Sequence, residues 1–169
     1  VQNAPQMAGQ RITLGRVETS EFDDGGVDGI TTGSGNDIVL GGDEGDTINA
    51  GEGNNIVLGD NGALDYTNAD SDATDIDEIV STSTTLGGGI DGITTGAGQD
   101  IVIGGRFNDT IGAGNGQNLV IGDSGRIRAA VQPPTRDSEP TIVASVAEID
   151  AIVATAVEAE RRWSATSSS

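Results

Sequence analysis

The stretch DDGGVDGITTGSGNDIVLGGDEGDTINAGEGNNIVL, residues 23–58, divides into four consecutive units of nine residues. A second stretch, LGGGIDGITTGAGQDIVIGGRFNDTIGAGNGQNLVI at 86–121, divides in the same register into four more. The sixth position of every unit is Asp or Asn, and the eighth is Ile or Val. A short fixed period is the signature of a repeat architecture, in which each unit packs only on its neighbours. The period therefore decides the fold class before any single element is considered.

Glycine recurs at the second and fourth positions of most units, and this explains how one unit turns. Without a Cβ, glycine adopts positive φ at no steric cost, and such a turn aims several backbone carbonyl oxygens at one point. The carboxylate of the sixth position adds negative charge near that point. Carbonyl and carboxylate oxygens together suit a hard cation of the size of calcium. The simpler alternative is that these Asp residues only form Asx turns, which do not require a carboxylate every nine residues.

The unit resembles G-G-x-G-x-D-x-U-x, the nonapeptide of the RTX, or hemolysin-type, calcium-binding repeat family. The resemblance covers 72 of the 169 residues and rests on two columns that all eight units share. It implies an all-β fold, a parallel β-roll or solenoid in which two units form one coil and calcium lies between stacked turns. The fixed apolar residue of each unit is then expected to point into a narrow core from a three-residue strand.

The resemblance also implies a set of calcium ligands in this chain. The side chains are those of the sixth position: Asp28, Asp37, Asp46, Asn55, Asp91, Asp100, Asp109 and Asn118. The carbonyl ligands are glycines of the turns: Gly33, Gly35, Gly42, Gly96, Gly98 and Gly105. The predicted stacking pairs are Asp28 with Asp46, Asp37 with Asn55, Asp91 with Asp109, and Asp100 with Asn118. We expect the pairs with two carboxylates to bind calcium more tightly, since ligand charge raises affinity.

Some units depart from the glycine pattern. Glu44 and Phe107 stand at the fourth position, where glycine is expected, and Asp23 and Asp24 open the first unit. We expect the turns at these residues to be re-shaped. The first block holds eight acidic residues and no basic residue, whereas the second holds three acidic residues and Arg106. Tighter calcium binding is therefore predicted for the first block.

A longer period of 63 residues contains the short one. DGITTGSGNDIVLGG at 28–42 recurs as DGITTGAGQDIVIGG at 91–105, and NNIVLGDNG at 54–62 recurs as QNLVIGDSG at 117–125. We interpret the chain as four segments: a lead-in with a partial repeat (1–22), a first β-roll repeat (23–85), a second β-roll repeat (86–148), and a degenerate cap with a flexible tail (149–169).

Sixty-three is an odd multiple of nine, so ordinary coils of two units cannot fill one repeat. We expect residues 59–85, and likewise 122–148, to form one wide coil, which gives three coils per repeat. Strands are predicted near 64–67 and 77–83 of the first wide coil. The composition of 154–162 favours a short C-terminal helix.

The composition excludes several classes of function. The chain carries 27 acidic residues and eight arginines, without lysine, histidine or cysteine, for a net charge of −19. Such a charge repels nucleic acid and anionic membranes. Without His and Cys, Ser-His and Cys-His machinery and zinc or haem sites are excluded, and the turns lack the Lys-Ser/Thr of a phosphate-binding loop. No window is apolar enough to span a bilayer. We predict no enzyme activity, no nucleic-acid partner and no membrane span.

The residues that flank the fixed apolar position differ between alternate units. In the first and third units of each block they are polar or small, and include Thr31, Thr47, Thr94 and Thr110. In the second and fourth units they are aliphatic: Ile38, Leu40, Ile56, Leu58, Ile101, Ile103, Leu119 and Ile121. One sheet should therefore have a wet outer face, and the other an apolar outer face that must be covered. Residues 142–157 or another chain could cover it, and the 63-residue recurrence of this face favours self-association.

These observations favour a calcium-binding structural module of a secreted or cell-surface repeat protein, of the adhesin, surface-layer or filament type, that folds and stiffens on calcium. The alternative is the calcium-folded C-terminal export module of a type I secreted enzyme. The resemblance implies an extracellular or cell-surface location reached by type I secretion. An ice-binding surface is a third interpretation, which the threonines of the wet face suggest and their interrupted spacing disfavours.

Overall fold

The computed structural model describes residues 13–69 and 73–130. These residues all belong to the unit Val1–Val131, and every structural statement below concerns them. The predicted helix at 154–162, the cap and tail at 149–169, and the covering segment at 142–157 lie outside the described residues.

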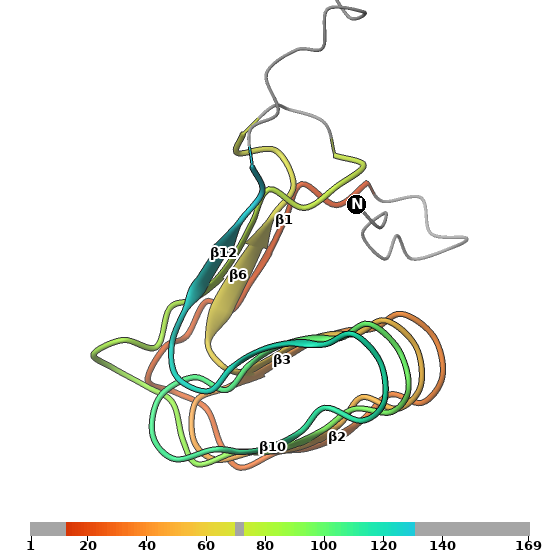
Figure 1. Ribbon diagram of the computed structural model, residues 1–169. Coiled ribbons are helices and arrows are strands. Elements are labelled where there is room, and N and C mark those ends of the chain that lie inside the picture. Colours follow the sequence, from red (N-terminus) through yellow and green to blue (C-terminus); the bar gives the residue numbers. More distant parts are fainter. Residues whose placement is uncertain (1–12, 70–72, 131–169) are drawn as a thin grey trace, which may run out of the picture. The chain divides into compact units, whose positions relative to one another are not determined.

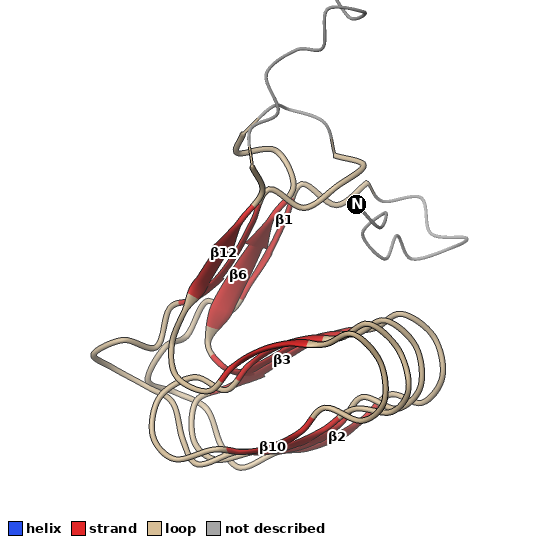
Figure 2. Ribbon diagram, viewed as in Figure 1, coloured by secondary structure: helices blue, strands red, loops and turns tan. Residues whose placement is uncertain are grey.

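The described residues form twelve short strands and no helix (Figure 2). The strands make three sheets of four. The threonine sheet consists of β2 (Gly29–Thr31), β4 (Thr47–Asn49), β8 (Gly92–Thr94) and β10 (Thr110–Gly112). The aliphatic sheet consists of β3 (Ile38–Gly42), β5 (Ile56–Asp60), β9 (Ile101–Ile103) and β11 (Leu119–Ile121). The cover sheet consists of β1 (Arg16–Glu18), β6 (Gly62–Asp65), β7 (Glu78–Ser81) and β12 (Arg126–Arg128).

The chain passes alternately between the threonine sheet and the aliphatic sheet, and both are parallel throughout. The two repeats lie side by side in Figure 1, because β4 pairs with β8 and β5 with β9 across their boundary. The predicted all-β fold with parallel strands is thereby confirmed.

The fixed apolar position of each unit points inward, as predicted, and forms a core between the two parallel sheets. Its members stack in register, with Ile48 beside Ile93 and Val57 beside Val102. β-branched side chains suit these positions because they pack well on a pleated surface. Val57 and Val102 are completely buried, whereas Val120, on the edge strand β11, is 42% exposed. Val39, on the opposite edge strand β3, is only 5% exposed, so the core is more open at the β11 end of the sheet.

Residues 59–85 do not form the wide coil that the 63-residue period suggested. Strands do occur close to the predicted positions, but β6 and β7 pair with each other antiparallel. β1 pairs with β6 and β12 pairs with β7, also antiparallel, which completes the cover sheet. The chain leaves the parallel sheets after β5 and returns beside β4 as β8. The odd number of nine-residue lengths in one repeat thus causes no change of register in the parallel sheets, because β6 and β7 belong to a different sheet.

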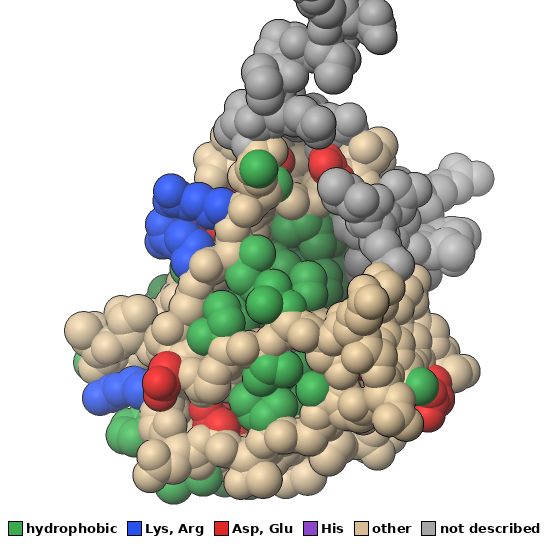
Figure 3. Space-filling model, in the orientation of Figure 1, with side chains coloured by type: hydrophobic (Ala, Val, Ile, Leu, Met, Phe, Trp, Pro, Cys, Tyr) green, Lys and Arg blue, Asp and Glu red, His purple; other side chains and the backbone are tan. Residues whose placement is uncertain are grey.

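The apolar outer face of the aliphatic sheet is covered by the cover sheet of the same chain. Leu64, Tyr66 and Ile79 form one buried cluster with aliphatic residues of β5 and β9, and Figure 3 shows apolar side chains gathered where the two sheets meet. Of the eight predicted face residues, only Leu119 is largely exposed, at 47%. The expectation of self-association through this face is therefore corrected, because strands that we assigned to a wide coil already cover it.

The two turns that lack glycine at the fourth position have a positive φ there. Glu44 has φ of 66° and Phe107 has φ of 82°. The fourth-position glycines stacked beside them, Gly26 and Gly89, do not have a positive φ, so these two turns differ from their neighbours, as expected. For a residue with a Cβ, this conformation costs about 1–2 kcal/mol.

Replacing Glu44 by glycine should therefore stabilise the protein. Glu44→Gly removes the left-handed penalty, and the gain should be about 1 kcal/mol after the entropy cost of glycine. Urea unfolding measures the change. Ala97→Gly is the matched control, because Ala97 is exposed and outside the positive-φ residues, and it should lose up to about 1 kcal/mol. A loss of stability in Glu44→Gly would contradict the strain.

Packing between the aliphatic and cover sheets predicts a second effect. Leu64 is completely buried, so Leu64→Ala should lower the free energy of unfolding by about 2–5 kcal/mol. Leu119→Ala removes the same atoms from a half-exposed position and should cost less than about 1 kcal/mol. Equal losses in the two variants, measured by urea unfolding, would argue against a covered face.

Candidate metal centre

The sixth-position residues form two rows of hydrogen bonds, which we call ladders. The first ladder contains Asp28, Asp46, Asp91 and Asp109. The N–H of Asp28 donates to Oδ1 of Asp46 at 2.8 Å, the N–H of Asp46 to Oδ1 of Asp91 at 2.7 Å, and the N–H of Asp91 to Oδ1 of Asp109 at 3.0 Å. Both predicted pairs are brought together. The bond between Asp46 and Asp91 joins them across the repeat boundary, and it was not predicted.

The second ladder contains Asp37, Asn55, Asp100 and Asn118. The N–H of Asp37 donates to Oδ1 of Asn55 at 3.1 Å, the N–H of Asn55 to Oδ1 of Asp100 at 2.9 Å, and the N–H of Asp100 to Oδ1 of Asn118 at 3.0 Å. The two predicted pairs are again neighbours. Every side chain that accepts in a ladder uses one oxygen to bind the backbone of the adjacent turn.

The other carboxylate oxygen, Oδ2, is buried without a hydrogen-bond partner in most of the Asp residues of the ladders. These residues are Asp37, Asp46, Asp91, Asp100 and Asp109. Three of them are at most 2% exposed: Asp46, Asp91 and Asp100. A buried charge without a partner is costly, and proteins normally neutralise it with a proton, an ion pair or a metal.

Glycine carbonyl oxygens line the same space in the first ladder. A Cβ placed on Gly41 would lie 1.9 Å from the carbonyl oxygen of Gly59 and 2.4 Å from Oδ2 of Asp46. The arrangement recurs around Gly59, with Oδ2 of Asp91 and the carbonyl of Gly104, and around Gly104, with Oδ2 of Asp109 and the carbonyl of Gly122. In each of these turns a carboxylate oxygen and a carbonyl oxygen approach a common point, and glycine leaves that point open.

This donor set fits an oxygen-binding cation held by few carboxylates. No group of three or more acidic side chains that could hold a metal occurs within 13–69 and 73–130. Each Asp with an unpaired Oδ2 offers one free oxygen, so backbone carbonyls or water would have to supply the remaining ligands. Calcium accepts this mixture, and its flexible geometry tolerates irregular turns.

The predicted carbonyl glycines lie in the turns between the parallel sheets. Four of them have φ between 117° and 138°: Gly33, Gly35, Gly42 and Gly105. A Cβ on Gly98 would lie 1.9 Å from the carbonyl oxygen of Gly53, and one on Gly96 would lie 2.7 Å from that of Gly51. Stacked turns therefore approach too closely for a larger residue at these positions.

Asp60 is a buried member of the region that the sequence analysis did not select. It ends β5, is 1% exposed, and accepts hydrogen bonds from the N–H groups of Gly89, at 2.8 Å, and Arg106. These hydrogen bonds connect the turns that precede β8 and β10 to the end of β5. The signal that could have found it is its recurrence as Asp123 in the repeated motif G-D-N/S-G.

Burial raises the pKa values of the stacked carboxyl groups. The pKa of Asp91 rises to about 7, mainly because desolvation disfavours its charged form, and the charges of Asp60, Asp109 and Asp46 add to this effect. Desolvation is also the main cause of the raised pKa values of Asp46, Asp60 and Asp109. Near neutral pH, Asp91 therefore favours either a proton or a bound cation.

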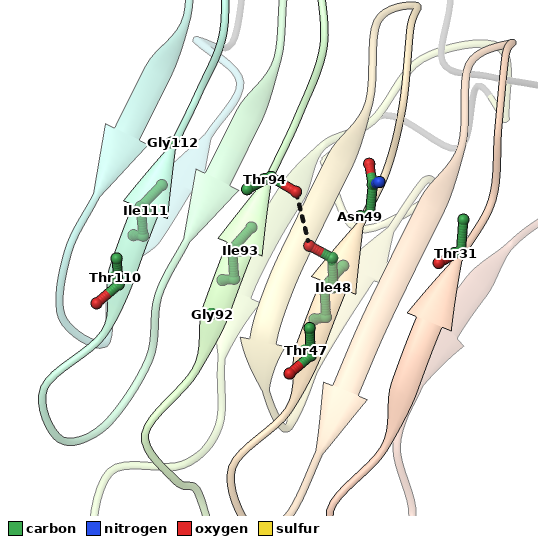
Figure 4. A pocket seen from close by; sticks show the side chains of 10 residues that line it. All are labelled: Thr31, Thr47, Ile48, Asn49, Gly92, Ile93, Thr94, Thr110, Ile111 and Gly112. Carbon is green, nitrogen blue, oxygen red and sulfur yellow. Dashed lines mark hydrogen bonds between the residues drawn. The ribbon is translucent and has the colours of Figure 1, made fainter.

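The outer face of the threonine sheet carries a shallow groove without a charged side chain (Figure 4). Its four threonines are exposed, as predicted: Thr31, Thr47, Thr94 and Thr110. Along one row, Asn49 lies between Thr31 and Thr94, and Gly112 follows. The threonines therefore form no continuous row, and the groove offers a cation no carboxylate.

No family model, curated protein or solved structure matches the chain. The described part of the chain contains no helix with the length and apolar character needed to cross a membrane.

The raised pKa values predict how pH affects the metal-free protein. The folded state binds more protons than the unfolded state between the ordinary Asp pKa of 3.8 and the value of about 7 for Asp91. Its stability in chelator should therefore rise as pH falls from about 7 to about 4, and should be lost as pH rises through the same range.

Circular dichroism and urea unfolding in chelator at several pH values measure this dependence. Asp91→Asn keeps an oxygen for the ladder but removes the titrating group, so its stability should vary less with pH. Stability that increases with pH over this range would contradict the raised pKa values.

Proposed function

We propose that this chain is a calcium-binding structural module, a parallel β-roll that forms part of a secreted or cell-surface repeat protein. The observation that carries the proposal is the row of buried, unpaired Oδ2 atoms beside glycine carbonyls in the first ladder. Calcium bound there would supply the positive charge that the buried carboxylates lack, and would join successive turns.

The chain's own residues would hold the ion in recurring pairs. Asp46 with the carbonyl of Gly59, Asp91 with that of Gly104, and Asp109 with that of Gly122 supply the converging oxygens. Oδ1 of each Asp stays on the backbone of the adjacent turn. One carboxylate therefore sets the register with one oxygen and binds the cation with the other.

Three further properties support calcium as the ligand. The chain has no His or Cys, and oxygen-only donors favour calcium over zinc, copper or iron. The net charge is −19, so the carboxylates repel one another until cations arrive. The core is narrow, with one branched residue per unit facing inward, and a small core commonly depends on metal binding for its stability. An extracellular location, where calcium is abundant, is part of the proposal.

Folding should therefore depend on calcium. In chelator at neutral pH the β signal in circular dichroism should be weak, and millimolar calcium should restore it. Magnesium at the same concentration is the control for ionic strength, and it should be much less effective because it requires near-ideal octahedral geometry.

A matched pair of variants locates the effect. Asp46→Ala should raise the calcium concentration needed for folding. Glu21→Ala removes the same charge from an exposed residue outside the repeats and should leave that concentration nearly unchanged. A full β spectrum in chelator, with no heat of calcium binding, would refute the proposed function.

A further inference from the structure

Asn55 and Asn118 differ from the Asp residues of the ladders in what their second terminal atom does. Nδ2 of Asn55 donates to the carbonyl oxygens of Gly51, at 3.1 Å, and Gly53, at 3.2 Å, both in its own turn. Nδ2 of Asn118 donates to the carbonyl oxygens of Ala113 and Gly114 in the equivalent turn. Each amide therefore closes the turn to which it belongs.

The ladder determines which way these amides face. Oδ1 of Asn55 accepts the N–H of Asp37, and Oδ1 of Asn118 accepts the N–H of Asp100. An oxygen must occupy this position, because the backbone group is a donor. The nitrogen then faces the turn carbonyls, which are acceptors, so both contacts are satisfied together.

An Asp at the same position has no N–H with which to make the second of these contacts. Asp37 and Asp100 alternate with the two asparagines in the second ladder, and Oδ2 of each is buried without a partner. Asp100 is 1% exposed, and Asn55 is completely buried. Equally enclosed positions thus carry either an amide that donates to carbonyl oxygens or a carboxylate oxygen with nothing to bind.

We propose that Asn55 and Asn118 are amide substitutes for the cation, and that their two turns take up no calcium. In these turns the side-chain NH₂ binds carbonyl oxygens of its own turn, which are then not free to bind a divalent cation. The inference rests on the proposed function and specifies which of the sixth-position residues do not bind calcium. Each repeat then carries three carboxylate turns and one amide turn, and the amide turn is always the fourth unit.

The position of the amide turns gives them a distinct role. Asn55 directly precedes β5 and Asn118 directly precedes β11. After these two strands the chain leaves the parallel sheets for β6 and β12 of the cover sheet. The amide turns therefore fix the points of departure without metal, while the carboxylate turns respond to it.

One atom separates the two kinds of turn, so single substitutions should convert one into the other. Asn55→Asp keeps the ladder oxygen but places a carboxylate oxygen against the carbonyls of Gly51 and Gly53. The variant should bind about one additional calcium ion per chain and need more calcium to fold. Asp100→Asn is the reverse change, and it should bind about one ion fewer and need less calcium to fold.

The experiment uses the full chain in four forms: wild type, Asn55→Asp, Asp100→Asn and the control Asn54→Asp. Calorimetry gives the number of calcium ions bound, and circular dichroism against free calcium gives the folding midpoint. Asn54→Asp adds the same charge one residue away, where the side-chain oxygen accepts the N–H of Gln99 at 2.8 Å. Its stoichiometry should equal that of wild type.

The results separate this inference from the proposed function. If Asn55→Asp binds as many ions as wild type and folds at the same calcium concentration, the amide substitution is refuted while calcium binding stands. If wild type binds no calcium, the proposed function fails, and Asn55→Asp should then weaken the fold equally with calcium and with chelator. Should Asn55→Asp not fold at any calcium concentration, Asn118→Asp, at the exposed end of the stack, decides by the same criterion.

Discussion

The hydrogen bond from a backbone N–H to Oδ1 of the residue stacked beside it holds each turn in register with the next. A strand that slipped by one residue would turn its inward Ile or Val to the outside, and the ladders oppose this because each side chain reaches only one N–H. The second terminal atom of the same residue is thereby confined inside the turn. In our proposal, one side chain both holds the stacked turns in register and binds the cation. Whether the residue is Asp or Asn decides whether its turn requires a cation.

The cover sheet solves a problem that the repeats create. Apolar residues on both faces of a parallel strand require layers on both sides, and the narrow core between the parallel sheets supplies only one of them. The excursion after β5 supplies the other, with Leu64, Tyr66 and Ile79 packed on the outer face of the aliphatic sheet. The 63-residue period is therefore the length of chain needed to build two strands of each parallel sheet and their cover.

The nonapeptide period was sufficient to predict the parallel strands, the inward residues and the pairs that lie 18 residues apart. It could not reveal the cover sheet, because β6 and β7 carry no nonapeptide and their partners are set by tertiary packing. For the same reason it missed the contact of Asp46 with Asp91, which requires the intervening excursion to leave the stack. Asp60 was missed because its role depends on Gly89 and Arg106, which are remote in sequence.

The backbone conformation of two residues could not be predicted from the sequence either. At Glu44 and Phe107 the residue type argued against a left-handed turn, yet both residues adopt this conformation. The hydrogen bonds of the Asn55 amide depend on the path of its own turn. The sequence therefore suggested only a weaker calcium ligand at this position, and it could not show that the amide NH₂ has carbonyl partners of its own.

The strand pairing also has a mechanical consequence. At the boundary between the two repeats, β4 pairs with β8, β5 with β9, and β7 with β12. Each pair takes one strand from each repeat, so all three sheets are continuous across the boundary. A boundary of this kind is not a hinge, because a force that pulls the repeats apart acts on three strand pairs at once. Under tension the two repeats should therefore unfold together and not one after the other.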